Sequence, residues 1–183
     1  FFRAGALEVP IFSTLYAAVA QIILPEITEL YGQKQTQKIS HLKNLTCINT
    51  ASIIFPIAVF FVFYAQDFIL LYLSEKYAAS VIIFQVYTLT LFMRIYDYLD
   101  ILTAANRART IVMINVISLV VNIVLNYVFI AEFGLVGAAI ATVVAKFFYA
   151  ACLVILSAKT LEVNVREIFD YIGLTKILLI SIV

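Results

Sequence analysis

Long apolar runs, most of them with few charges, follow one another along almost the whole chain. Five of them are complete, and a sixth begins at Tyr171 and continues to Val183; the complete runs cover residues 10–31, 45–73, 78–105, 111–131 and 135–158. A helix needs about 20 apolar residues to cross the hydrocarbon core of a bilayer. The sequence therefore predicts an all-α integral membrane protein, a multi-helix bundle with five full transmembrane helices and the start of a sixth.

The composition supports this class and argues against others. The chain is 64% hydrophobic and 13% charged, whereas soluble domains are about 45–50% apolar and about 25% charged. A net charge of +1 without a dense basic patch argues against a nucleic-acid partner. Cys47 and Cys152 lie in apolar segments, and no metal-ligand spacing of cysteines is present. We therefore expect both to be buried as small hydrophobic residues. We expect no metal site and no cofactor.

The linkers between the runs differ in charge. Segments 32–44, 106–110 and 159–170 together hold seven Lys or Arg residues, against Arg3 and Lys76 on the opposite side. Cytoplasmic loops of membrane proteins carry the excess of Lys and Arg. We therefore expect a multi-pass protein of the inner (plasma) membrane with these three linkers in the cytoplasm.

Ionisable residues interrupt two of the runs. Arg94, Asp97 and Asp100 share about a third of the circumference of the predicted helix 78–105, and Lys146 lies near the middle of the run 135–158. Charge inside a membrane is costly and marks functional sites. Arg94 and Lys146 are thus candidates for binding an anionic group such as a phosphate. Asp97 and Asp100 are candidates for a coupling cation, H⁺ or Na⁺; alternatively, Asp97 is the structural partner of Arg94.

A polar stripe runs along the fourth predicted helix. Asn115, Ser118, Asn122 and Asn126 fall within an arc of about 80°. They either line a cavity and bind substrate hydroxyls, or form hydrogen bonds between helices. The next helix begins with small residues from Gly134 to Ala145, a spacing that lets two helices approach closely. We expect the short turn at 132–134 to join these helices as a hairpin.

Three segments resemble one transporter superfamily. They are NIVLNYVFIAEFGLVGAAIATVVAKF (122–147), KYAASVIIFQVYTL (76–89) and LPEITELYGQ (24–33). All three resemble the multidrug/oligosaccharidyl-lipid/polysaccharide (MOP) flippases, most closely the polysaccharide and O-antigen branch. The resemblance implies two six-helix bundles around a central cavity, with residues 1–183 forming most of the C-terminal lobe.

The same resemblance implies a function without enzymatic catalysis. The protein would flip a lipid-linked (polyprenyl-diphosphate) oligosaccharide from the cytoplasmic to the outer leaflet for surface polysaccharide biosynthesis. Its partners would be this lipid-linked substrate, membrane lipids and a coupling cation. Two alternatives are a cation-coupled multidrug exporter of the same superfamily and, more remotely, a membrane-embedded polysaccharide-processing enzyme, for which the short outer loops offer no acid–base cluster.

Overall fold

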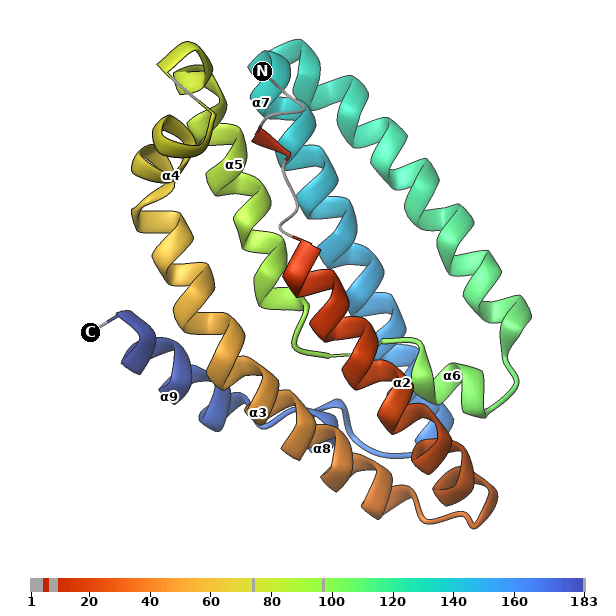
Figure 1. Ribbon diagram of the computed structural model, residues 1–183. Helices are drawn as coiled ribbons and strands as arrows, with labels where there is room; N and C mark the ends of the chain where they lie inside the picture. The colour runs from red at the N-terminus through yellow and green to blue at the C-terminus, as the bar shows by residue number, and fades with distance from the viewer. Residues whose placement is uncertain (1–4, 7–9, 74, 97, 183) are drawn as a thin grey trace.

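The computed structural model describes residues 5–6, 10–73, 75–96 and 98–182, and within these ranges it contains helices and no strand. This confirms the predicted all-α class. The helices in chain order are α2 Pro10–Gly32, α3 Thr36–Phe63, α4 Ala65–Tyr72, η1 Glu75–Ser80, α5 Val81–Thr88, η2 Leu89–Met93, α6 Asp100–Ala104, α7 Ala108–Leu161, α8 Val165–Ile168 and α9 Tyr171–Ile182 (Figure 1).

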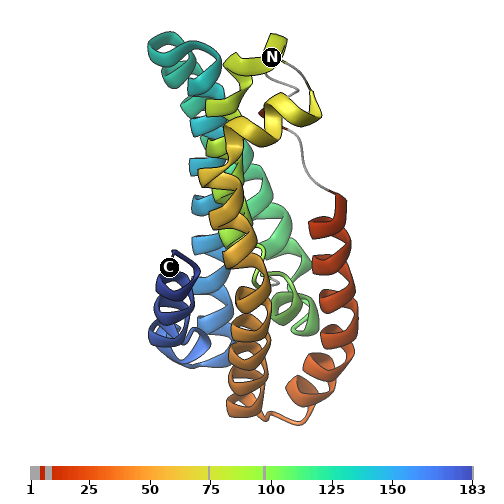
Figure 2. The same cartoon turned by 60° about the vertical axis from the view of Figure 1, so that its left-hand side comes forward.

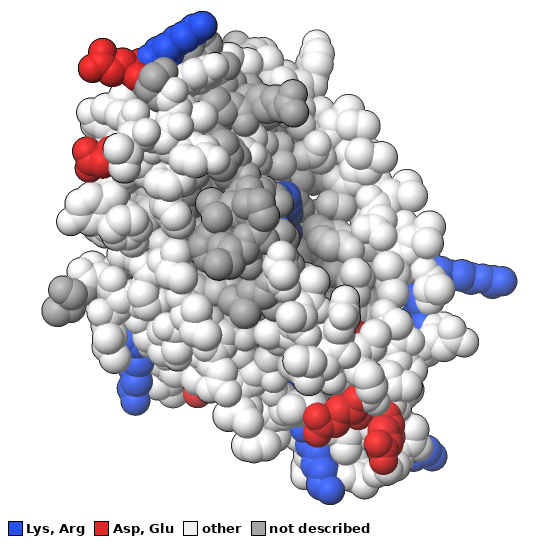
Figure 3. Space-filling view, viewed as in Figure 1, with Lys and Arg blue, Asp and Glu red and all other residues white. Residues whose placement is uncertain are grey.

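Several of these helices are long and apolar enough to cross a membrane. Within the described residues they are Thr36–Phe63, the segment Glu75–Met93, and Ala108–Leu161. The longer helices run roughly along one common axis, which gives the elongated bundle seen in Figures 1 and 2. In the view of Figure 3, charged side chains gather toward the two ends of this bundle and its middle is mostly uncharged. Such a belt suits a bilayer, where uncompensated charge is costly.

Helix α7 is a hairpin of two arms. A straight helix of its 54 residues would be about 81 Å long, against a hydrocarbon core of about 30 Å. The chain reverses at Gly134, whose backbone is left-handed at φ 59° and ψ −135°. Gly137 lets the arms meet closely, because a Cβ there would lie 1.9 Å from the Phe129 carbonyl oxygen. The hairpin predicted between 111–131 and 135–158 is confirmed.

The third predicted helix, 78–105, is not continuous. The segment is divided into η1, α5 and η2, and then into α6, with no regular helix at Arg94–Tyr96 or Tyr98–Leu99. Irregular backbone at membrane depth is tolerated where protein buries it or where it lines a cavity. Here Ile95 and Tyr96 pack into a core cluster with Cys47 and Ile54 of α3. Residues 78–105 contain neither glycine nor proline, so no local residue signal predicts the break.

Helix α3 begins nine residues earlier than the predicted start at 45, and it ends at Phe63 rather than at 73. The predicted linker 32–44 is therefore helical from Thr36 onward. Placing Lys43 in a linker is therefore wrong, because it lies within α3 and its side chain is 4% exposed. The burial follows from helical periodicity. Ile39, Lys43 and Cys47 recur every four residues and all lie on the buried face of α3.

The three linkers predicted to be cytoplasmic lie at one end of the bundle. The connections from α2 to α3, from α6 to α7 and from α7 to α9 all lie at the lower end in Figure 1, whereas η1 and the Gly134 turn lie at the upper end. The last connection is anchored to α3, since the Asn44 Nδ2 donates to the Glu167 carbonyl at 2.8 Å. Its short helix α8 is capped reciprocally by Asn164 and Glu167.

Candidate functional site

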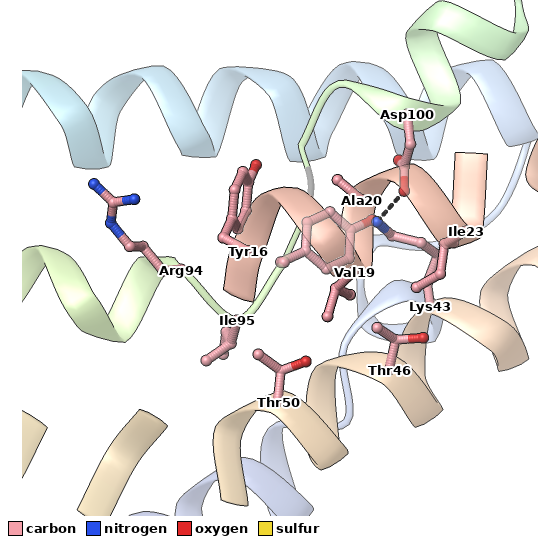
Figure 4. Close-up of a pocket in the computed structure, with 11 residues that line it drawn as sticks. Tyr16, Val19, Ala20, Ile23, Lys43, Thr46, Thr50, Arg94, Ile95 and Asp100 are labelled. Carbon is pink, nitrogen blue, oxygen red and sulfur yellow. Dashed lines mark hydrogen bonds and ion pairs between the residues drawn. The ribbon is translucent and has the colours of Figure 1, made fainter. Parts of the chain in front are cut away.

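A cavity opens beside the break in the third predicted helix. Its walls come from four parts of the chain that are distant in sequence: α2, α3, the end of η2 with the break, and α6 (Figure 4). The lining residues are Tyr16, Val19, Ala20, Ile23, Lys43, Thr46, Thr50, Arg94, Ile95, Tyr96 and Asp100. Its innermost space is about 10 Å³, room for about one water molecule. The cavity is therefore narrow at its polar groups.

A buried ion pair lies at one end of the cavity. The Lys43 ammonium donates to the Asp100 carboxylate, and their side chains are 4% and 1% exposed. Lys43 Nζ also lies 3.6 Å from the centre of the Tyr96 ring. The other Asp100 oxygen accepts from the Ile101 backbone N–H at 2.7 Å. The carboxylate considered for a coupling cation thus has a lysine partner, while Asp97 lies outside the described residues.

Arg94 lines the same cavity from the other side. It follows η2, and its backbone N–H donates to the Leu91 carbonyl at 2.9 Å. Figure 4 shows its guanidinium extending away from the Lys43–Asp100 pair and toward α7. The side chain is half-buried. Arg94 and Asp100 are therefore brought into one cavity by the break and not by a shared helix face.

The polar stripe predicted on the fourth helix meets Lys146 in an open groove between the two arms of α7. This groove has a volume of about 380 Å³ and is lined by Asn115, Ser118, Leu119, Asn122, Thr142, Ala145, Lys146 and Tyr149. Part of the stripe also joins helices, since the Ser118 hydroxyl donates to the Ala145 carbonyl at 3.5 Å. Asn126 donates to the Asn122 carbonyl at 2.9 Å and to its side-chain oxygen at 3.0 Å. Ser118 thus joins the two arms, whereas the Asn126–Asn122 bonds lie within one arm.

Arg94 and Lys146 line different hollows. Arg94 belongs to the cavity beside the break, and Lys146 belongs to the α7 groove. Lys146 Nζ lies 6.0 Å from the ring centre of Tyr87 on α5, seven residues before Arg94. The α5–η2 segment therefore lies next to both cations. In Figure 3 a basic side chain is visible inside a hollow in the middle of the molecule.

Comparison with known proteins adds a family. The family model described as "Lipid II flippase MurJ" matches residues 7–183. The chain belongs to the MurJ lipid II flippase family. No curated protein and no solved structure matches it.

Membership of the MurJ family defines the protein as a multi-pass membrane flippase of a lipid-linked saccharide and not as an enzyme. It supports the MOP superfamily that the sequence resembles, without singling out the O-antigen branch. The cavity of this MurJ-family chain therefore lies in a protein that transports a lipid-linked saccharide.

Among the cavity residues of this MurJ-family chain that sequence reasoning missed are the polar ones from α3, Lys43, Thr46 and Thr50. Lys43 belongs to the predicted linker 32–44, and the two threonines belong to the start of the predicted helix 45–73. A signal was available, because the apolar positions Ile39, Cys47 and Ile54 already define a helical face that begins before residue 45. Lys43 and Thr50 lie on that face.

Proposed function

We propose that this chain takes part in moving a polyprenyl-diphosphate-linked saccharide from the cytoplasmic to the outer leaflet, with Arg94 and Lys146 engaging the diphosphate. The helix break beside the cavity is the main observation in support. Discontinuous helices in transporters supply binding sites near the middle of the membrane. Here the break brings Arg94 to a cavity whose other polar groups come from α2, α3, α6 and Tyr96 of the break.

The chemistry of the cations suits this substrate. A guanidinium binds phosphate oxygens through two parallel N–H donors, and an ammonium offers a compact charge with three donors. The saccharide would lie along the α7 groove, where Asn115, Asn122 and Thr142 present amide and hydroxyl groups for sugar hydroxyls. The polyprenyl tail would remain in the lipid, so that only the polar head requires a shielded path.

The family name favours lipid II over an O-antigen unit as the saccharide carried. In the proposed arrangement, residues 1–183 belong to the C-terminal lobe of a two-lobed flippase, and linkers 32–44, 106–110 and 159–170 face the cytoplasm. The two lobes would open the cavity to each leaflet in turn. A multidrug exporter coupled through Asp100 is less well supported, because that carboxylate already pairs with Lys43.

The test is flipping by the full-length protein in cells depleted of their own lipid II flippase. Arg94→Ala and Lys146→Ala should each lower the amount of lipid II that an outer-leaflet labelling reagent detects, by about tenfold or more for a lost charged hydrogen bond. Arg109→Ala is the matched control, since Arg109 is an exposed arginine in the first turn of α7.

Protein abundance in the membrane is measured in parallel with flipping. Normal flipping by both Arg94→Ala and Lys146→Ala at normal abundance would rule out the proposed diphosphate site. Parallel assays with an O-antigen lipid and with dye efflux decide among the substrates: transport of dye alone would assign the chain to drug export.

A further inference from the structure

Lys43 contacts the chain on both sides of the helix break. On the N-terminal side of the break it lies over the Tyr96 ring, with Nζ 3.6 Å from the ring centre. On the C-terminal side the same ammonium pairs with the Asp100 carboxylate at the start of α6. One side chain of α3 thus holds two points of the segment that connects η2 to α6.

Hydrogen bonds fix the described residues at the two ends of the break. The Arg94 N–H closes η2 on the Leu91 carbonyl, and a regular helix pattern resumes with the Thr103 N–H on the Leu99 carbonyl at 2.8 Å. The Tyr98 hydroxyl donates to the Met93 carbonyl at 3.0 Å, so a side chain also joins the two ends. Side-chain contacts from Lys43 and Tyr98 thus connect η2, from which Arg94 leaves, to the chain that follows the break.

The Lys43–Asp100 pair is almost completely buried. The two side chains are 4% and 1% exposed, and the cavity beside them has room for about one water molecule. Removing one partner of a buried ion pair leaves an uncompensated charge. We expect the resulting rearrangement at the break, since its described residues lie outside regular helix, whereas α3 continues as a regular helix through position 43.

We propose that Lys43 and Asp100 are positioning residues that hold the break in place and thereby aim Arg94 at the diphosphate of the substrate. This inference rests on the proposed function, because Arg94 is the residue through which the pair acts. In Figure 4 the Arg94 guanidinium points away from the pair, so the two cations play different parts: Lys43 neutralises Asp100, and Arg94 meets the ligand.

The experiment measures binding of undecaprenyl diphosphate to the full-length protein in nanodiscs, together with thermal unfolding of each variant. The variants are Arg94→Gln, Lys43→Met, Asp100→Asn, the charge-swapped double variant Lys43→Asp/Asp100→Lys, and the conservative Lys43→Arg. Lys38→Met is the matched control, because Lys38 is an exposed lysine on the same helix.

We expect Arg94→Gln, Lys43→Met and Asp100→Asn each to weaken binding by about tenfold or more, the effect of losing a charged hydrogen bond. Lys43→Arg and the swapped variant should regain most of the lost affinity, and Lys38→Met should bind normally. If the single variants fail to fold, the comparison of Lys43→Arg and the swapped variant with the parent protein still decides.

Two results would overturn the positioning role. One is normal binding by well-folded Lys43→Met and Asp100→Asn. The other is a swapped variant that unfolds at the parent temperature but still binds weakly, which would make the Lys43 charge a direct ligand. Normal binding by Arg94→Gln would instead remove the proposed diphosphate site itself, and that outcome is distinguishable because it does not involve the pair.

Discussion

Lys43 and Asp100, 57 positions apart in the sequence, form an ion pair almost completely excluded from solvent. The pair joins α3 to α6 across the interrupted third apolar run. A buried ion pair is costly to desolvate, so we attribute this one to fixing the geometry of the break more than to stabilising the fold. Arg94 lines the cavity that this geometry shapes.

The first prediction concerns the stability of that pair. Lys43→Met alone should lower the free energy of unfolding by about 3–5 kcal/mol, because it leaves the Asp100 charge buried without its partner. The double variant Lys43→Met/Asp100→Leu should recover most of this loss, since well-packed apolar residues can replace a buried pair. Thermal unfolding of the purified protein measures both. A double variant as unstable as the single one would contradict the explanation.

The second prediction concerns the α7 hairpin. Gly137→Ala should destabilise the protein by about 1–3 kcal/mol or more, the usual cost of overpacking. The added Cβ would lie 1.9 Å from the Phe129 carbonyl oxygen, and this backbone atom cannot move away cheaply. Gly32→Ala is the control, since a Cβ there meets nothing within 4 Å. Equal unfolding temperatures for the two variants would show that the hairpin is not closely packed at Gly137.

The third prediction separates binding from packing in the α7 groove. Asn115 is exposed and lines the groove, so Asn115→Ala should lower the flipping rate while the unfolding temperature stays within about a degree of the parent value, as expected for a surface substitution. Val116→Ala, at the next exposed position but outside the groove lining, should change neither quantity. Unchanged flipping in Asn115→Ala would leave that position without a role in binding.

The fourth prediction concerns orientation in the membrane. With Cys47 and Cys152 replaced by Ala, single cysteines at Lys38, Arg109 and Lys159 should be protected from a membrane-impermeant thiol reagent in intact cells. A cysteine at Lys76 should be labelled. The excess of Lys and Arg on linkers 32–44, 106–110 and 159–170 is the physical reason. The opposite labelling pattern would invert the proposed topology.

The sequence anticipated the fold class because hydrophobic length is a local property. Each run long enough to cross a bilayer is visible without knowledge of its neighbours, and so is the turn at Gly134 with the small residues that follow it. The polar stripe from Asn115 to Asn126 also follows from helix periodicity, because its residues are close together in the chain. Its proximity to Lys146 came only from the folded hairpin.

The cavity could not be predicted in the same way. Arg94 and Asp100 looked like one face of a helix, because a regular helix is the natural interpretation of 28 residues without glycine or proline. The described residues around the break pack against Lys43, Cys47 and Ile54, which belong to another helix. The sequence alone puts Lys43 in a linker, because Lys and Arg are concentrated in the loops between membrane helices.

The amino-acid sequence by itself determined that the chain is helical, lies in a membrane and carries charge where charge is costly. Only the tertiary structure decided which charges meet. It interrupted the third run, paired Asp100 with Lys43 from α3, and left Arg94 at the edge of a cavity and Lys146 in a separate groove. The physical reason is that a buried charge must find its partner in space, and that partner can lie anywhere along the chain.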